Sequence, residues 1–532
     1  MAAAESELRS HGSGNSKAID NEKDDAALAS SNASDAGSPL DIDRDMEKSA
    51  PVEAISDQGH APDPADPNVV DWDSPDDPQN PMNWSDKKKW SNIAVLSVLT
   101  LLTPLASSMF APGVPQLVKD FHVTSQALET FVVSVYILGF AFGPLVLAPL
   151  SEMYGRVVIY NVCNVCYLAF TIACALSQNI GQLIGFRFLA GSFGVAPITL
   201  GGGTIADIMK AEKRGSAMSV WAMGPLLGPV IGPVCGGFLS NAKGWRWIFW
   251  VLAIAIGAAT IGCFLVARET YAPVLLERKT KRLRKETGNE DLVSKLDLGI
   301  TPKQLWIRSL VRPAKLMFLS PICALMSLYL AIIYGILYLL FTTFTFVFEG
   351  AYHFSESIVG LVYIALGVGM LLGLAILGTQ SDPIMKRLAA KHNGGTPKPE
   401  YRLPLLMYGA PFIPVGLFIY GWTAQYHIQW AVPLFGTLLV GVGLLAGFMC
   451  INTYLIDAYT RYAASALAAN TVLRSIFGAV FPLFALQMYD ALGLGWGNSL
   501  IAFVSLAMVP IPFVFYYYGE RIRTHPKFQV KL

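Results

Sequence analysis

Charged side chains are rare within the long apolar stretches of this sequence, so the few that fall there are candidates for chemistry. Arg187 and Arg474 lie well inside such stretches, Glu129 opens one, and Asp207 and Asp457 each close one. A charge at bilayer depth is costly, and a carboxyl group there gains or loses a proton when its surroundings change from apolar to wet. The chemistry that these residues predict is proton uptake and release.

Three of these residues, Arg187, Glu129 and Asp207, are the candidates for proton coupling. Glu129 is the first candidate for the proton carrier, and an interfacial, solvated acid is the alternative. A buried guanidinium stays protonated, so Arg187 would act by biasing a neighbouring acid or by organising water. A structural arginine bonded to carbonyl groups of the first apolar segment is the alternative for Arg187.

A short loop with one acid and one base is a candidate gate. It carries Glu152, Gly155 and Arg156, and a similar loop in the second half of the chain carries Asp382 followed by Arg387. The similarity of the two loops indicates a duplicated six-helix unit. We expect Glu152 and Arg156 to act as a latch at one membrane face.

Two more acids are expected to join gate networks at the same face. Asp207 is expected to pair with Arg214, and Asp457 with Arg461, because each base follows its acid closely in sequence.

One apolar segment, residues 216–240, combines glycines with prolines. Gly228, Gly232, Gly236 and Gly237 form a small-residue face, and Pro233 is one of three prolines in the segment. Small residues four apart let helices approach closely, and proline removes a backbone hydrogen bond and permits bending. We expect a helix that packs tightly against its neighbours and flexes.

A substrate cavity should be mostly apolar, with a few directional polar groups. Aromatic and amide side chains in several apolar segments fit this description, although aromatic side chains that face lipid or the core are the alternative. The candidates are Tyr136, Phe140, Trp221, Tyr334, Tyr338, Phe341, Asn452, Tyr454 and Asn470.

The elements that must position these residues are membrane-spanning helices. The 532 residues are 53% hydrophobic and 14% charged, whereas soluble chains carry about 25% charged residues. About 20 apolar residues cross a bilayer, and twelve such segments, six in each half, predict an all-α membrane protein of two pseudo-symmetric six-helix bundles. The segments are 91–112, 128–149, 157–176, 181–206, 216–240, 245–267, 321–347, 356–379, 403–422, 429–457, 462–488 and 494–518.

Charge distribution predicts the domain organisation and the orientation. Residues 1–80 contain 19 acids and 5 bases, which indicates a disordered acidic tail, expected over 1–88. At its end, residues 77–89 favour a short ordered segment beside the membrane, with a turn-rich linker that carries a basic anchor as the alternative. The expected bundles cover 89–267 and 317–518, joined by a middle loop at 268–316 and followed by a short tail at 519–532. Lysine and arginine concentrate in alternate loops, which places both termini and the middle loop in the cytosol.

These motifs together resemble the major facilitator superfamily. Leu150, Gly155 and Arg156 match its first-loop motif, Glu152 replaces the aspartate, and residues 148, 153 and 157 depart from it. The run 228–237 resembles the antiporter motif of drug–proton exchangers, with Ser219 where that motif has its upstream glycine. The resemblance implies the major facilitator fold and alternating access.

Further stretches resemble the fungal twelve-span branch of these exporters. They are residues 77–84, 268–279 and 457–470, with Arg474 and 481–484. In this family an Arg-x-x-x-Gly pattern in the fourth span, here Arg187 and Gly191, is tied to proton coupling. The run 268–279 differs from the sequence that sugar transporters carry after their sixth span, which makes sugar transport less favoured.

The resulting prediction is a plasma-membrane, multi-pass exporter of hydrophobic drugs, toxins or secondary metabolites, driven by proton antiport. Its partners would be protons, a hydrophobic small molecule and lipid, without nucleic acid; we expect a monomer with no cofactor and no metal. The alternative is a uniporter or symporter that imports a small organic nutrient or a polyamine. An enzyme is disfavoured because the seven histidines are scattered through the tail and loops, and no phosphate-binding loop for ATP is present.

Overall fold

The computed structural model describes residues 68–528 except 298 and 300, and the side chains of all of these except 211, 212, 461 and 527. Most of the expected acidic tail, residues 1–67, lies outside the described residues. Nearly all of the described chain is helical, because its long apolar segments must satisfy their backbone hydrogen bonds internally.

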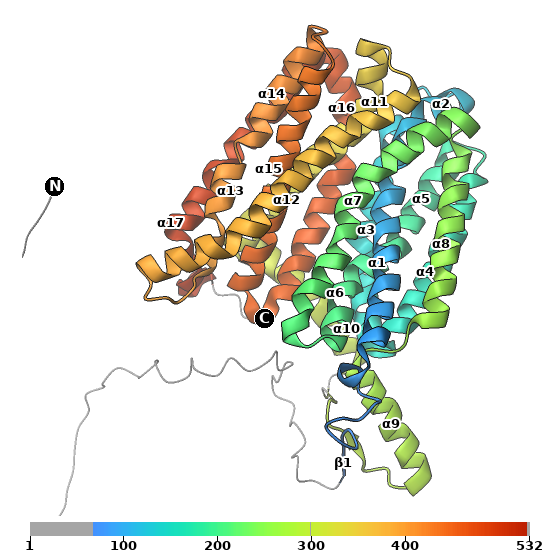
Figure 1. The fold of residues 1–532 in the computed structure, drawn as a ribbon, viewed down its shortest axis with the longest axis vertical. Helices are drawn as coiled ribbons and strands as arrows, with labels where there is room; N and C mark the ends of the chain where they lie inside the picture. The colour runs from blue at the N-terminus through green and yellow to red at the C-terminus, as the bar shows by residue number, and fades with distance from the viewer. Residues whose placement is uncertain (1–67, 298, 300, 529–532) are drawn as a thin grey trace, which may run out of the picture. The chain divides into compact units, whose positions relative to one another are not determined.

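The first half of the chain contains α1 to α8 (Figure 1, blue to green). Within it, α1 packs against α7, α3 against α5, and α4 against α8. The bounds are α1 Asp86–Ser108, η2 Ala111–Gly113, α2 Val114–Asp120, α3 Gln126–Tyr154, α4 Arg156–Ala175, α5 Ile180–Gly194, α6 Ala196–Ile208, α7 Ala211–Lys243 and α8 Arg246–Val266.

The second half contains α11 to α17 (Figure 1, yellow to red). Here α11 packs against α16, α12 against α15, and α14 against both α15 and α16. The bounds are α11 Pro321–Tyr352, α12 Glu356–His392, η3 Pro399–Arg402, α13 Pro404–Gly409, α14 Phe412–Gln425, α15 Ala431–Ala458, η4 Thr460–Tyr462, α16 Ala463–Met508, α17 Pro510–Thr524 and η5 Pro526–Phe528.

Eleven helical segments of the described chain are long and apolar enough to cross a membrane, and the last of them is 62 residues long. That segment, Ala463–Thr524, is interrupted at Gly493, where φ is +74°. The chain turns back there, since the Tyr489 hydroxyl donates to Asn498 at 3.0 Å although nine residues separate them. Nine helical residues would span about 13 Å. The expected twelve crossings are therefore present.

Two pairs of helices join the halves: α3 packs against α16, and α7 packs against α12. These are the second span on the eleventh and the fifth span on the eighth, so the contact follows the duplication. For clarity, the tail face is the membrane face where the chain enters at Asp86 and leaves at Thr524, and the far face is the opposite one.

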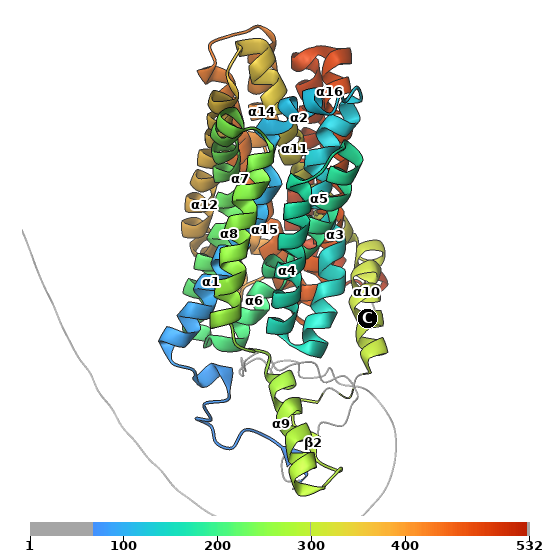
Figure 2. The same cartoon turned by 90° about the vertical axis from the view of Figure 1, so that its right-hand side faces the viewer.

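The middle of the chain is more ordered than a polar loop. It forms α9 Ala272–Thr287, β2 Val293–Ser294 and α10 Pro302–Leu319, which lie at the tail face (Figure 2). Of the expected disordered tail, residues 68–88 instead form β1 Val69–Val70, η1 Pro81–Asn83 and the start of α1.

The expectation of disorder over 1–88 is wrong for residues 68–76, because residues 69–73 have partners in the middle of the chain; residues 77–88 are ordered, as expected for a segment beside the membrane. Val69 and Val70 pair in parallel with Val293 and Ser294. Lys279 donates to the backbone oxygen of Asp71 at 2.9 Å and to the carboxylate of Asp73 at 2.6 Å.

Candidate functional site

The glycine face of α7 lies directly against α1. A Cβ atom added to Gly228 would lie 2.9 Å from the backbone nitrogen of Leu105, and one added to Gly236 would collide with the backbone oxygen of Met109. Gly232 approaches Ser108 in the same way. Only a helix without side chains along this face can come so close, so the seam meets a neighbouring helix and not lipid.

The end of the same seam reaches the second half of the chain. A Cβ atom on Gly237 would lie 2.6 Å from the backbone oxygen of Glu356, and one on Gly360 would lie 2.6 Å from the oxygen of Pro233. Backbone therefore meets backbone where α7 crosses α12. This crossing is a close contact between the two halves.

At the far face, polar side chains tie the halves together. Glu356 at the start of α12 accepts hydrogen bonds from Gln116 Nε2 at 2.7 Å and from Ser240 Oγ at 2.8 Å. Asn241 donates to Ser357 at 2.9 Å beside them. We call Gln116, Ser240 and Glu356 the far-face latch.

Further contacts join the halves between the far face and the middle of the membrane. The Tyr338 hydroxyl lies 3.2 Å from Ser107 Oγ, and Ser134 Oγ donates to the backbone oxygen of Ala479 at 2.9 Å. Gln126 donates to Asp490 at 2.6 Å at the far ends of α3 and α16.

At the tail face of the first half, Arg156 is the centre of a buried network. Its Nε lies 3.3 Å from Asp207 Oδ2, and its Nη1 donates to Ser151 Oγ at 2.8 Å. Arg156 therefore joins the tail-face ends of α3, α4 and α6. The Glu152 carboxylate makes no hydrogen bond with the described residues, although it lies near enough to Arg156 to interact electrostatically.

Glu269, which follows α8, also belongs to this network. Its carboxylate accepts from the backbone N–H groups of Arg156 at 2.9 Å and Val157 at 3.3 Å, so it caps the first turn of α4. Gly155 has φ +100°, and a Cβ there would collide with Glu269 Oε2. Burial and the nearby Glu152 carboxylate raise the pKa of Tyr271 to about 12, which keeps its ring neutral against Arg156.

The second half repeats the network around Arg402. Its Nη1 lies 2.6 Å from Asp382, and its Nε lies 3.0 Å from Asp457. Nη1 also donates to Ser381 Oγ at 3.2 Å. A base at the start of one span thus joins the ends of two others in each half.

One expected gate pairing is wrong, and the other involves Arg461, whose side chain lies outside those that the structure describes. Asp207 pairs with Arg156, while Arg214 donates to the backbone oxygens of Ala206 and Met209 at the end of α6. Asp457 pairs with Arg402. The partner of Asp207 is therefore not the arginine that follows it in sequence but one that the packing of spans brings from another helix.

The two networks differ from the far-face latch in one respect. The ion pairs of Arg156 stay within the first half, and those of Arg402 stay within the second. The latch bonds cross between the halves. The structure therefore has the halves joined at the far face and not joined by these two networks at the tail face.

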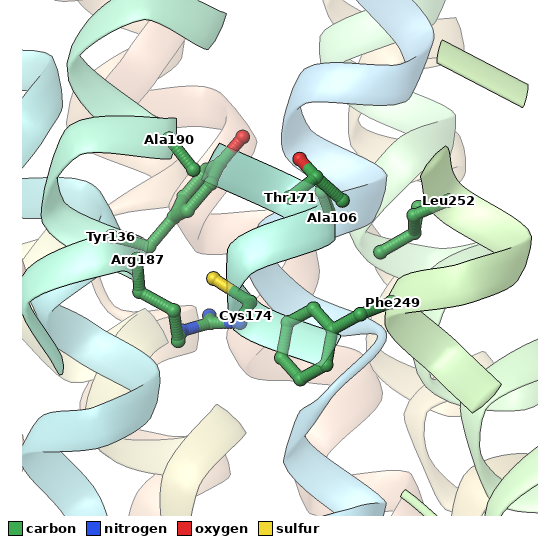
Figure 3. A pocket seen from close by; sticks show the side chains of 8 residues that line it. All are labelled: Ala106, Tyr136, Thr171, Cys174, Arg187, Ala190, Phe249 and Leu252. Atoms are coloured by element: carbon green, nitrogen blue, oxygen red, sulfur yellow. The ribbon is translucent and has the colours of Figure 1, made fainter. Parts of the chain in front are cut away.

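Arg187 is fully buried inside the first half, at 1% exposure. Its Nη2 donates to the backbone oxygens of Ser107 and Val133 at 3.3 and 3.2 Å, and its guanidinium lies 5.0 Å from the ring centre of Phe110. Among the described residues no carboxylate pairs with it. It lines a small cavity with Tyr136, Cys174 and Phe249, formed by first-half helices alone (Figure 3).

Arg187 therefore makes the carbonyl contact that the alternative interpretation, a structural arginine bonded to the first span, predicts. Its Nε is buried and has no hydrogen-bond partner. Glu129 is half-buried in the first turn of α3, and its carboxylate makes no hydrogen bond or ion pair with the described residues.

Most of the expected cavity residues lie in the interior. Tyr136 donates to Thr103 and packs edge-on against Phe140, Trp221 donates to Pro197, and Phe341 packs against Tyr338. Asn470 donates to Asn452 at 3.0 Å. Tyr334, Tyr338, Asn452 and Asn470 therefore share one region, where α11, α15 and α16 meet.

Tyr454 does not belong to that region. Its hydroxyl lies 3.2 Å from where a Cβ on Gly519 would stand, so it faces α17. Tyr454 is two residues from Asn452 in α15, and side chains two positions apart in a helix point to nearly opposite sides. The expectation that Tyr454 lines a cavity with Asn452 is wrong for this reason.

Sequence reasoning did not single out four residues that the structure places in the candidate gates, Glu269, Gln116, Glu356 and Arg402. Glu269 lies within residues 268–279, which resemble the fungal twelve-span exporters, and this resemblance is the sequence feature that could have identified it. Glu356 and Gln116 stand at the ends of helices, where charged side chains are ordinary, so no sequence signal separated them from solvated surface residues.

A transport protein of two linked six-helix halves is the class that this fold and these gates define. The sequence model of the Major Facilitator Superfamily matches residues 96–482. The chain belongs to this superfamily.

Curated relatives and solved structures agree with this assignment. The chain is 64% identical over 467 residues to "Efflux pump radE" of Floropilus chiversii, covering 88% of this chain and 87% of that protein. It is 56% identical over 506 residues to "MFS-type transporter penM" of Penicillium rubens, covering 95% and 98%. The fold is similar to a D-xylose–proton symporter (TM-score 0.59, 16% identity, covering 80% of this chain and 98% of that one).

Proposed function

We propose that this protein is a secondary active exporter of hydrophobic drugs, toxins or secondary metabolites, driven by proton antiport. The observation that carries the proposal is the glycine face of α7, which lies against α1 and ends on α12. A close, smooth contact between helices permits rocking of one half against the other. The printed name of one relative, an efflux pump at 64% identity, supports the outward direction.

The gates supply the two states that alternating access needs. With the latch closed at the far face and the two arginine networks separate, a substrate would enter from the tail face. The basic loops on that side support a cytosolic tail face, with both termini in the cytosol. The membrane that we propose is the plasma membrane. Breaking the latch and bringing the networks together would then expose the substrate outside.

Proton coupling is assigned to groups that change surroundings between these states. Asp207, at the end of α6, is held by Arg156, and movement of α4 or α6 would release its carboxyl group to accept a proton. Glu129 at the far end of α3 is the second acid. No acid of the described residues pairs with Arg187, so its role would be to hold α1 and α3 in place around a polar cavity.

Inside-out plasma-membrane vesicles from an exporter-depleted yeast strain test the proposal. With an acidic lumen, vesicles that carry the full chain should accumulate hydrophobic fluorescent dyes and aromatic metabolites from a panel, and a protonophore should abolish this accumulation. Asp207→Asn should uncouple uptake from the pH gradient, whereas Asp490→Asn, an exposed acid at the far face, should not. Uptake that is driven by an alkaline lumen, or that needs no gradient, would identify a symporter or uniporter instead.

A further inference from the structure

Arg474 is a cation at mid-membrane for which no residue in the described part of the chain supplies a counter-charge. It lies eleven residues into α16, roughly 16 Å from the start of that helix at the tail face. It makes no hydrogen bond or ion pair with any described residue, and its Nε is buried. A guanidinium in this position is costly, and intramembrane charges mark substrate or ion pathways.

The acids on the packed helices lie away from Arg474. The helices that pack on α16 are α3, α10, α11, α14 and α15, and their acids stand at helix ends. Asp457 is nine residues from Phe448, which contacts Arg474, and is already bound by Arg402. The acids of these helices and of α16 itself are Glu129, Glu152, Glu349, Asp457 and Asp490.

Two aromatic rings hold the guanidinium. It lies 5.0 Å from the ring centre of Tyr334 on α11 and 5.2 Å from that of Phe448 on α15. Contacts to two different helices place the side chain inside the bundle and not toward lipid. Rings around a cation fix its orientation and leave its N–H donors for another partner.

One helical turn away, two amides extend the same surface. Asn470 is four residues before Arg474, and Asn452 is four residues after Phe448, so each pair shares a helix face. Asn470 Nδ2 donates to Asn452 Oδ1 at 3.0 Å, and Asn470 Oδ1 is buried without a partner. The surface thus offers guanidinium donors, two rings and one open carbonyl acceptor.

We propose that Arg474 is the counter-charge for an organic anion, and that the transported substrates are aromatic or conjugated acids. A carboxylate or phenolate would bind the guanidinium as a bidentate or charge-assisted partner. The conjugated ring would stack beside Tyr334 and Phe448, and a neighbouring hydroxyl of the substrate would donate to Asn470 Oδ1. This inference rests on the proposed export function and names its substrate class.

Binding to the purified full chain in nanodiscs tests the site without requiring transport. Thermal unfolding is followed with 2-naphthoate, 9-anthroate and 4-phenylbenzoate, each against its neutral carboxamide. We expect the acids to stabilise the protein at concentrations roughly ten-fold lower than the amides need. Arg474→Gln should remove this preference, and Arg474→Lys should retain part of it.

Arg312→Gln is the matched control, because Arg312 contacts the ring of Tyr462 from α10, outside the spans. It makes the same chemical change and should keep the acid preference. Unfolding without ligand checks that each variant is folded. Equal stabilisation by acids and amides, or an equal loss of both in Arg474→Gln, would overturn the inference.

The same probes in inside-out vesicles separate this inference from the export proposal. Uptake of acids over amides that Arg474→Gln abolishes supports both. Selective binding of acids without gradient-driven uptake would refute export and keep the anion site. Gradient-driven uptake that favours the amides would keep export and refute the anion site.

Discussion

The side-chain amide of Gln116 donates a hydrogen bond to Glu356 at 2.7 Å, and this bond joins the first half of the chain to the second. Ser240 donates to the same carboxylate oxygen at 2.8 Å. One oxygen therefore receives two donors from the first half, next to the backbone contact of Gly237 with Glu356. A single acid is thus placed to control whether the far face is closed.

Glu356→Ala should open the far face. It leaves two donors without an acceptor, and a lost hydrogen bond to a charged group costs about 1.5–3 kcal/mol, enough to shift a two-state equilibrium roughly ten-fold or more. Spin labels at Lys243→Cys and Tyr426→Cys, in a background without the seven native cysteines, should show a larger population at long distances.

Asp490→Asn is the control for this measurement, since Gln126 and Asp490 also join the halves but are exposed to solvent. It should shift the distances much less. Identical distance distributions for Glu356→Ala and the parent would show that the latch does not hold the far face.

Glu269→Gln should destabilise the tail-face end of α4. The carboxylate accepts from four backbone N–H groups, those of Arg156, Val157, Thr270 and Tyr271. The neutral amide weakens the remaining bonds and turns one oxygen into a donor, at a cost of about 1–3 kcal/mol. Thermal unfolding in detergent should show a lower midpoint than for the parent.

Glu277→Gln provides the comparison, because Glu277 forms an exposed pair with Lys281 four residues on. Exposed pairs contribute about 0–1 kcal/mol, so the midpoint should hardly move. If the two variants unfold alike, the cap on α4 is not a stabilising contact.

The number and order of the spans could be predicted from the sequence because apolar length is a direct physical requirement of the bilayer. The seam of α7 could be located for a similar reason, since glycines four apart must share a face. The partner of that face could not, and only packing identifies Leu105 and Met109 as its neighbours.

The gate pairings show where sequence reasoning stops. By its spacing from Asp382, Arg387 is the counterpart of Arg156. However, α12 continues to His392, so Arg387 is still part of the helix that carries Asp382, and the base that binds Asp382 is Arg402. Hydropathy marks where a helix leaves the membrane and not where it ends. Glu269 caps a helix 113 residues away in sequence, a distance over which no local pattern carries information.

Lys279→Ala should release the segment before α1 from the middle of the chain. The Lys279 ammonium is buried at 7% exposure and binds the backbone oxygen of Asp71 and the carboxylate of Asp73. Because Asp73 is exposed, the ion pair contributes little, and the effect should be local. Hydrogen exchange at residues 68–73 and 292–295 should speed up several-fold, while Lys281→Ala, on the exposed side of α9, should leave it unchanged.

The ion pair between Asp71 and Lys295, which joins the same two segments, should also weaken in acid. Burial raises the pKa of Asp71, but hydrogen bonds from Lys295 and from the backbone of Trp72 outweigh it and leave the pKa below its ordinary value of 3.8. Its contribution is therefore present above that value and lost as the pH falls through the lower, folded-state pKa. Exchange at 292–295 that is independent of pH between 5 and 3, after correction for intrinsic rates, would contradict the pairing of Asp71 with Lys295.

Gly236→Ala should slow transport without abolishing the fold. The added methyl group collides with the backbone oxygen of Met109, which cannot rotate away as a side chain would, so α7 and α1 must separate. Overpacking of this kind costs about 1–3 kcal/mol, and the cost falls on the α1–α7 contact of the first half, one residue from Gly237, where α7 crosses α12. Gly262→Ala on α8 meets nothing within 4 Å and is the matched control. Vesicle uptake should fall roughly ten-fold in Gly236→Ala and stay at the parental rate in Gly262→Ala. Equal rates in the two variants, at equal expression and equal thermal midpoints, would mean that the close approach of α7 and α1 has no part in the transport cycle.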